Sequence, residues 1–173
     1  LVNSVTELGV ATVLFSLPPP GFDGAAYAPF ISDPDADYEG RIEIDLGAIE
    51  PQVALPGGPE RAAPVSSVAG LPIQHAFIGS CGSGMHQDFV DAAALMRGRR
   101  VAEGVRLFVV PGSVVTAQRL ADEGLTRVFM EAGAIILPAG CGPCAGGLMG
   151  PLGAGEVSIS TAATSSADSP SLR

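Results

Sequence analysis

The sequence contains no lysine and no tryptophan, and only 5% of its residues are aromatic. So few rings argue against a protein that recognises its ligand with an aromatic cage. All nine basic residues are arginine, and the net charge is -9. Because no basic stripe is present to neutralise phosphates, we expect no nucleic-acid partner.

Long hydrophobic runs are also missing. No apolar stretch approaches the roughly 20 residues that a membrane-spanning helix needs, and no charged segment followed by an apolar one opens the chain. We therefore expect a cytoplasmic protein without a membrane partner. The cysteines number three, which fits reduced thiols that ligate or react better than a disulfide framework.

What is present indicates an α/β protein. The chain has 173 residues, 47% of them apolar, with 23 glycines and 15 prolines, which suits one domain or part of a larger one. From residue 71 the patterns alternate: strands in IQHAFIGS, VRLFVVPGS, AGAIILPAG and GEVSISTA, and helices in HQDFVDAAALM, VTAQRLADEGL and LTRVFMEAG. Such units predict a parallel sheet covered by helices, with ligands at the carboxyl ends of the strands.

Three regions are expected. Residues 1–70 would be loop-rich, with one short helix, a half-exposed strand at 41–46 and an irregular proline-rich segment at 50–70. Residues 71–161 would form the α/β part, and the polar residues 162–173 a flexible tail. On the predicted first helix, Asn3 and Glu7 would lie one turn apart and face the same way.

The cysteines lie in two glycine-rich loops, GSCGSG and GCGPCAGG, each at the end of a predicted strand. Cys141 and Cys144 form a C-x-x-C pair, and Cys81 precedes them in the first loop. A redox dithiol would leave Cys81 unexplained, and a structural zinc would need His75 or His86 as its fourth ligand. Simple packing is a third explanation. The fourth is an iron-sulfur cluster held by three thiolates, with one iron left open to substrate.

Longer stretches resemble a known family. The segments ISDPDADYEGRIEIDLGAIEPQVALP, VSSVAG, IGSC, RGRRVAEGVRLFVVPGS, EGLTRVFMEAGAIILPAGCGPCAGGLMG and GEVSIST are similar to the large subunit of 3-isopropylmalate dehydratase, in the aconitase superfamily. The similarity covers roughly residues 1–161. It implies a three-layer α/β/α fold with a parallel sheet, of the aconitase iron-sulfur domain type.

The resemblance also implies a site. Cys81, Cys141 and Cys144 would hold a 4Fe-4S cluster, while Asn3 and Glu7 would help to hold the oxygen at the open iron. The activity implied is a hydro-lyase that dehydrates and rehydrates a small hydroxy acid such as a 2-alkylmalate. Separate chains would supply the N-terminal half of the large subunit and the swivel domain or small subunit.

Some positions depart from the family pattern. Gly82, Ser83 and Met85 replace the Thr-Asn and the Arg that follow the family's first cysteine. Its Asn-Arg-Asn-Phe segment and a further Arg, which hold substrate carboxylates, correspond here to Ala163, Thr164, Ser165, Ser166 and Ser169. Two alternatives follow: a non-catalytic or degenerate iron-sulfur subunit, or a hydro-lyase of altered substrate class.

Three further polar residues lie near the predicted loops. His86 is interpreted as a polar residue at a helix start, with a cluster or substrate contact as the alternative, and His75 as a packed or edge histidine of a strand. Ser113 is expected to be a turn or helix N-cap residue.

Overall fold

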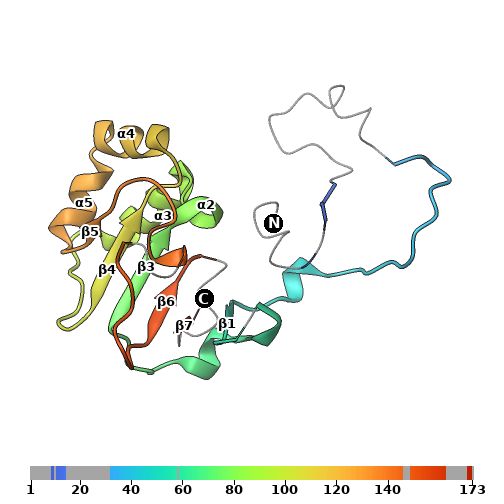
Figure 1. Cartoon of the computed structure of the whole chain (residues 1–173), viewed down its shortest axis with the longest axis horizontal. Helices are drawn as coiled ribbons and strands as arrows, with labels where there is room; N and C mark the ends of the chain where they lie inside the picture. The colour runs from blue at the N-terminus through green and yellow to red at the C-terminus, as the bar shows by residue number, and fades with distance from the viewer. Residues whose placement is uncertain are drawn as a thin grey trace. The chain divides into compact units, whose positions relative to one another are not determined.

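A computed structural model of the chain describes residues 9, 11–14, 32–57, 59–145, 149–162 and 171–172. The chain divides into two compact units, Leu1–Ile49 and Glu50–Arg173. The first contains the 3-10 helix η3 (Leu46–Ala48), whose preceding Asp45 side chain accepts a hydrogen bond from Gly47 N at 2.9 Å. Figure 1 traces the whole chain. No helix in the described residues is long and apolar enough to cross a membrane.

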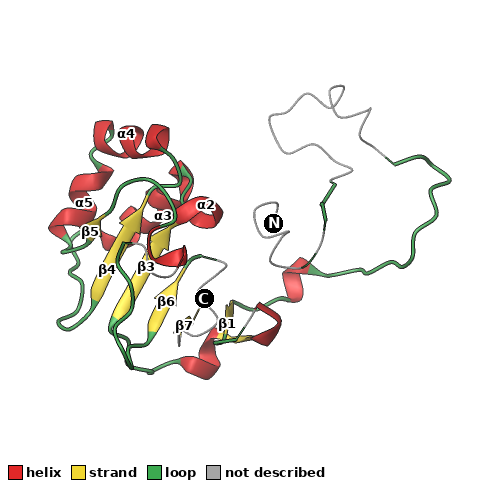
Figure 2. Ribbon diagram, in the orientation of Figure 1, coloured by secondary structure: helices red, strands yellow, loops and turns green. Residues whose placement is uncertain are grey.

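The second unit holds the sheet. Its strands are β3 (His75–Gly79), β4 (Arg106–Val110), β5 (Ile135–Ile136), β6 (Ser158–Ser160) and β7 (Ser171–Leu172). They pair in the order β5-β4-β3-β6-β7, and every pairing is parallel. Between them come α2 (Ser80–Ser83), α3 (His86–Met96), α4 (Val114–Asp122), α5 (Leu125–Glu131) and the 3-10 helix η6 (Gly142–Ala145) (Figure 2).

The two faces of the sheet are covered differently. On one face Val109 of β4 packs with Phe89 of α3 and Phe129 of α5, whose rings meet edge to face at 6.1 Å. Because successive strand residues point to opposite faces, Phe108 and Val110 lie on the other face. There they join a second cluster, against which Cys144 of η6 packs. In the described residues, α3, α4 and α5 contact one another and belong to the first face.

The parallel α/β prediction is confirmed, and its elements lie where the patterns predicted them. The helix expected in HQDFVDAAALM is α3, and the buried strands expected in IQHAFIGS and VRLFVVPGS are β3 and β4. These segments succeed because each carries the periodicity of its own element and is buried by its neighbours.

The strand predicted at 41–46 is wrong. Residues 41–45 carry no regular structure, and Ile42 and Ile44 are 87% and 65% exposed. Alternating apolar residues form a strand only when another strand supplies hydrogen-bond partners. The described residues of the first unit contain no such strand.

The segment at 50–70 is more regular than predicted. It contains an antiparallel pair, β1 (Gln52–Ala54) and β2 (Ala62–Pro64), with η4 (Pro59–Arg61) between them and η5 (Val65–Val68) after them. The strands are too short for periodicity to reveal them, yet they bury Val53. The predicted tail at 162–173 likewise contains a strand, β7, which pairs with β6.

Candidate functional site

Cys81 lies directly beyond β3, at the carboxyl edge of the sheet. Strands β3, β4 and β5 follow one another in one direction across the sheet, whereas β6 lies on the opposite side of β3. In open α/β sheets, the crevice at such a reversal of strand order is where ligands bind. The first cysteine loop therefore starts at the position in the fold that is best suited to a site.

The turn between β3 and α2 is tight and strained. Gly79 has φ 126°, and a Cβ atom there would lie 1.9 Å from the Val110 carbonyl oxygen. Ser80 has φ 65°, which makes it the one non-glycine residue with positive φ among the described residues, and it is buried. Strain of this kind persists only where the surrounding structure enforces it, and it is common at functional sites. Sequence reasoning missed Ser80, because nothing in a serine that precedes a cysteine indicates a positive φ angle.

The second cysteine loop packs against the same strand end. Gly140 N donates a hydrogen bond to Pro111 O at 3.0 Å. Gly142 has φ 53°, and a Cβ atom there would approach Val110 Cγ2 to 2.7 Å. Within the loop, Cys144 N donates to Cys141 O at 3.1 Å, which sets the turn of η6. The C-x-x-C pair, which follows β5 in the chain, thus lies beside the end of β4.

The first loop is tied to that strand end as well. Gly112 N donates to Gly84 O at 2.8 Å, and any side chain at Gly84 would collide with backbone. Cys81 and Cys141 are exposed, and Cys144 is half-buried. The structure therefore places both cysteine loops against residues 110–112, as expected from the carboxyl ends of parallel strands.

The structure does not gather the three thiols into a ligand set. In the part of the chain that it describes, no three His, Cys, Asp or Glu side chains lie close enough together to hold a metal ion. The donors fit an iron-sulfur cluster by their chemistry, since thiolates are its usual ligands. The loops also fit it by their shared strand end and by glycines that leave little room for side chains.

Thr161, which lies beside the first cysteine loop, is a residue that sequence reasoning missed. Its hydroxyl accepts a hydrogen bond from Gly79 N at 3.0 Å, and its carbonyl accepts one from Ser83 Oγ at 2.8 Å. Thr161 therefore joins the end of β6 to both sides of the turn that carries Cys81. The only sequence signal was its place near the end of a predicted strand, GEVSISTA. Ser83, one of the departures from the family pattern, thus has a structural partner.

Other predicted residues lie outside the described part of the chain. Asn3 and Glu7 fall in residues 1–8, and the positions compared with the family's carboxylate-binding segment fall in residues 163–170. Their predicted roles are left unchanged by the structure.

His86 and Ser113 have structural partners in the described residues. His86 starts α3, and its Nε2 lies 2.6 Å from Glu123 Oε2. Hydrogen bonds from Arg119 and then from His86 lower the pKa of Glu123. Ser113 caps α4 by accepting a hydrogen bond from Thr116 N at 3.1 Å. The N-cap interpretation of Ser113 and the helix-start interpretation of His86 are confirmed.

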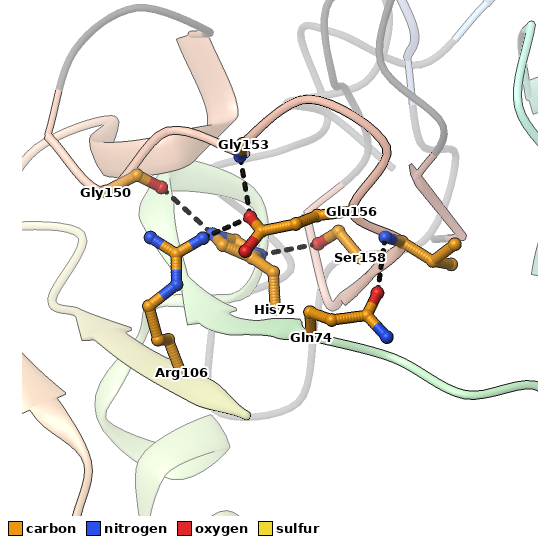
Figure 3. Close-up of polar contacts among 8 residues, drawn as sticks. Gln74, His75, Arg106, Gly150, Gly153, Glu156 and Ser158 are labelled. Atoms are coloured by element: carbon orange, nitrogen blue, oxygen red, sulfur yellow. Dashed lines mark hydrogen bonds and ion pairs between the residues drawn. The ribbon is translucent and has the colours of Figure 1, made fainter. Parts of the chain in front are cut away.

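His75 lies at the opposite, amino edge of the sheet, in a buried polar network (Figure 3). Its Nε2 is 2.9 Å from Gly150 O, and its Nδ1 is 2.7 Å from Ser158 Oγ. A carbonyl only accepts hydrogen bonds, so Nε2 carries the proton and Nδ1 accepts from the Ser158 hydroxyl. Burial is the main cause that lowers the pKa of His75. The prediction of a packed histidine is confirmed.

The same network holds the segment that follows the second cysteine loop. Arg106, paired in register with His75, forms an ion pair with Glu156, whose carboxylate also accepts from Gly153 N at 2.6 Å. Val157 N donates to the Gln74 side-chain oxygen at 3.0 Å. Residues 150–158 are thus joined to the starts of β3 and β4.

Comparison with known proteins agrees with this geometry. The model of the aconitase family (aconitate hydratase) matches residues 67–165, more than half of the chain, and the chain belongs to this family. Individual relatives indicate which members of the family the chain is similar to. The chain is 43% identical over 138 residues to the probable 3-isopropylmalate dehydratase large subunit of Methanothermobacter thermautotrophicus, an alignment that covers 80% of this chain and 33% of the relative.

Two further relatives carry the same name. The chain is 39% identical over 170 residues to 3-isopropylmalate dehydratase large subunit 1 of Methanopyrus kandleri, which covers 93% of this chain and 40% of the relative. It is 44% identical over 138 residues to the large subunit from Nitratidesulfovibrio vulgaris, with 80% and 33% covered. The chain therefore spans between a third and two fifths of the length of these relatives.

Proposed function

We propose that this chain is the cluster-bearing part of an aconitase-type hydro-lyase, which dehydrates and rehydrates a small hydroxy acid such as a 2-alkylmalate. The observation that carries the proposal is the arrangement of the two cysteine loops. Both pack against the end of β4 at the carboxyl edge, beside the reversal of strand order, in a chain of the aconitase family.

Cys81, Cys141 and Cys144 would hold the 4Fe-4S cluster. Bound by three thiolates, such a cluster supplies one iron that acts as a Lewis acid on substrate hydroxyl and carboxylate oxygens. The strained turn at Ser80 and the close contacts of Gly142 fix the backbone of the two loops, and this limits the positions that the thiolates can take. Positioned ligands of this kind need rigid support from the residues around them.

Glu7 and Asn3 would handle the departing oxygen. As the C–O bond of the hydroxy acid breaks, Glu7 would give a proton to the leaving hydroxyl so that water departs, and Asn3 would hold that oxygen by hydrogen bonding. The base that removes the proton from the neighbouring carbon would come from a partner chain. In rehydration, the same groups would return the proton and the hydroxyl.

Partner chains follow from the same proposal. The relatives are named large subunits, and such a name implies that a small subunit exists. The chain also spans only part of the length of these relatives. Next to the candidate site, Val114 and Val115 at the start of α4 are 75% and 76% exposed, and Met85 is exposed nearby. Apolar side chains gathered at one edge fit contact with another chain. We expect separate chains to supply the N-terminal half and the swivel domain.

A second candidate is a hydro-lyase of altered substrate class. Where the resembled family carries arginines for substrate carboxylates, this chain has Ala163, Thr164 and the serines at 165, 166 and 169. None of these side chains can form a bidentate ion pair with a carboxylate. A substrate with fewer carboxylates would account for both the family membership and the missing arginines. An arginine supplied by a partner chain would account for them as well.

Replacing Glu7 by Gln tests the catalytic proposal. The amide keeps the size of the side chain and cannot give up the proton, so we expect turnover by the assembled complex to fall by about 10²- to 10⁴-fold. Glu39→Gln, in the exposed acidic segment, is the matched control and should leave turnover unchanged. An unchanged rate in the Glu7 variant, with iron content retained, would favour a degenerate subunit.

A further inference from the structure

A basic concavity lies away from the candidate site, where helix α3 ends. It has a volume of about 460 Å³. Arg97, Arg99 and Arg100 line it from the segment after α3, and Val128 and Ala132 line it from α5. It thus combines three guanidinium groups with an apolar wall.

In the part of the chain that the structure describes, these arginines have no acidic partner. None of the ion pairs in the described residues involves Arg97, Arg99 or Arg100, although the chain has a net charge of -9. Glu131 also lines the concavity, but Arg127 Nε lies 2.7 Å from its Oε1. The positive charge of the three guanidiniums is therefore not balanced by the one carboxylate beside them.

Helix ends explain only part of this charge. Helices α3 and α5 both end here, and cations near helix C-termini are favourable. Each C-terminus carries the equivalent of about half a negative charge at most, so two ends offset roughly one guanidinium. About two positive charges are left over.

The backbone holds this segment in place. Arg97 N donates to Ala93 O at 3.0 Å, and Arg99 N donates to Met96 O at 3.0 Å across the turn at Gly98. Val101 N then donates to Ala132 O at 2.8 Å, which ties the segment to the end of α5. The arginines therefore project from a fixed backbone, and this lowers the ordering cost of binding a ligand.

We propose that this concavity binds a small organic oxyanion. Its phosphate or carboxylate group pairs with the guanidiniums of Arg99 and Arg100, which favour planar, bidentate contact with such groups. Its compact apolar body packs on Met96, Val128 and Ala132. The site is separate from the cysteine loops and does not depend on the proposed hydro-lyase activity.

Calorimetric titration of the full chain tests the proposal with four probes: phenyl phosphate, benzoate, inorganic phosphate and phenol. We expect phenyl phosphate and benzoate to bind more tightly than inorganic phosphate or phenol, because only they combine charge with an apolar body. Their affinity should fall as salt is added, since exposed charges are screened. If phenyl phosphate binds more tightly than benzoate, the natural ligand is a phosphate ester; the reverse order indicates a carboxylate.

Variants locate the binding. Arg99→Gln and Arg100→Gln should each weaken phenyl phosphate binding by about tenfold, which is the loss of one charge-assisted hydrogen bond. Arg41→Gln is the matched control, because it removes one exposed arginine from the other unit. Equal affinity in all three variants would overturn the proposal, and so would binding of phenol as tight as that of phenyl phosphate. All three residues are exposed, and circular dichroism verifies that the variants are folded.

Discussion

His75 shows how a single buried residue can link the sheet to the segment beyond the cysteine loop. The histidine is 1% exposed and lies between the Gly150 carbonyl on one side and the Ser158 hydroxyl on the other, and burial lowers its pKa. The sequence predicted a packed histidine. It could not predict the partners, because Gly150 and Ser158 lie 75 and 83 residues away in the chain.

This residue makes stability depend on pH. Burial lowers the pKa of His75 below 6.5, so the unfolded chain binds more protons than the folded one. The stabilisation is complete above the unfolded pKa and is lost as pH falls through about 6.5 towards the folded pKa. We expect the free energy of unfolding, measured in urea, to decline over that range.

Replacing His75 by Asn should flatten this decline, besides lowering stability by about 1–3 kcal/mol through the lost hydrogen bonds. Ser113→Ala, which removes a helix N-cap but no titratable group, is the control and should retain the slope of the wild type. An equal slope in the His75 variant would show that other groups cause the decline.

Gly142 is a second residue whose role can be isolated. Replacing it by Ala combines an unfavourable φ of 53° with a Cβ atom 2.7 Å from Val110 Cγ2. Gly104→Ala is the matched control, since its φ of 81° is also positive but no atom lies within 4 Å of the added carbon. We expect the Gly142 variant to lose about 1–3 kcal/mol more stability in urea unfolding. Equal losses would mean that the second cysteine loop does not need its close contact with β4.

At the scale of elements, periodicity succeeded where burial supports it. Helix α3 has the bounds that its sequence pattern predicted, because Phe89 and Ala93 are buried under the sheet. The pattern at 41–46 is equally regular, yet Ile42 and Ile44 are exposed and form no strand. A strand depends on a partner that its own sequence does not encode, whereas a helix forms its hydrogen bonds internally.

The candidate site was predicted at the same scale, as loops that follow strands. The prediction that both cysteine loops lie at the carboxyl edge is confirmed by the contacts of Gly140 and Gly84 with the end of β4. The strained Ser80 and the bridging Thr161 could not be predicted, because they result from pairing between distant strands. The shape of this turn depends on its contacts with the ends of β4 and β6 as well as on its own glycines.

At the scale of the whole molecule, the chain is one part of what its relatives contain. It belongs to the aconitase family but spans only 33% to 40% of the three relatives described above. Its two units differ in packing: the second unit has buried cores around Phe89 and Phe77, whereas residues 32–49 of the first unit are almost wholly exposed. The residues predicted to act on substrate, Asn3 and Glu7, come from the first unit by sequence. The proposed activity therefore requires both units and partner chains.

The central claim is that Cys81, Cys141 and Cys144 together hold an iron-sulfur cluster. The most direct test is the iron and acid-labile sulfide content of the chain after purification without oxygen. We predict about four irons and four sulfides per chain. Cys81→Ser, Cys141→Ser and Cys144→Ser should each lower both contents sharply, whereas Met85→Leu, an exposed neighbour of Cys81, should retain them. A wild-type chain without iron, or one whose iron survives all three cysteine substitutions, would contradict the account.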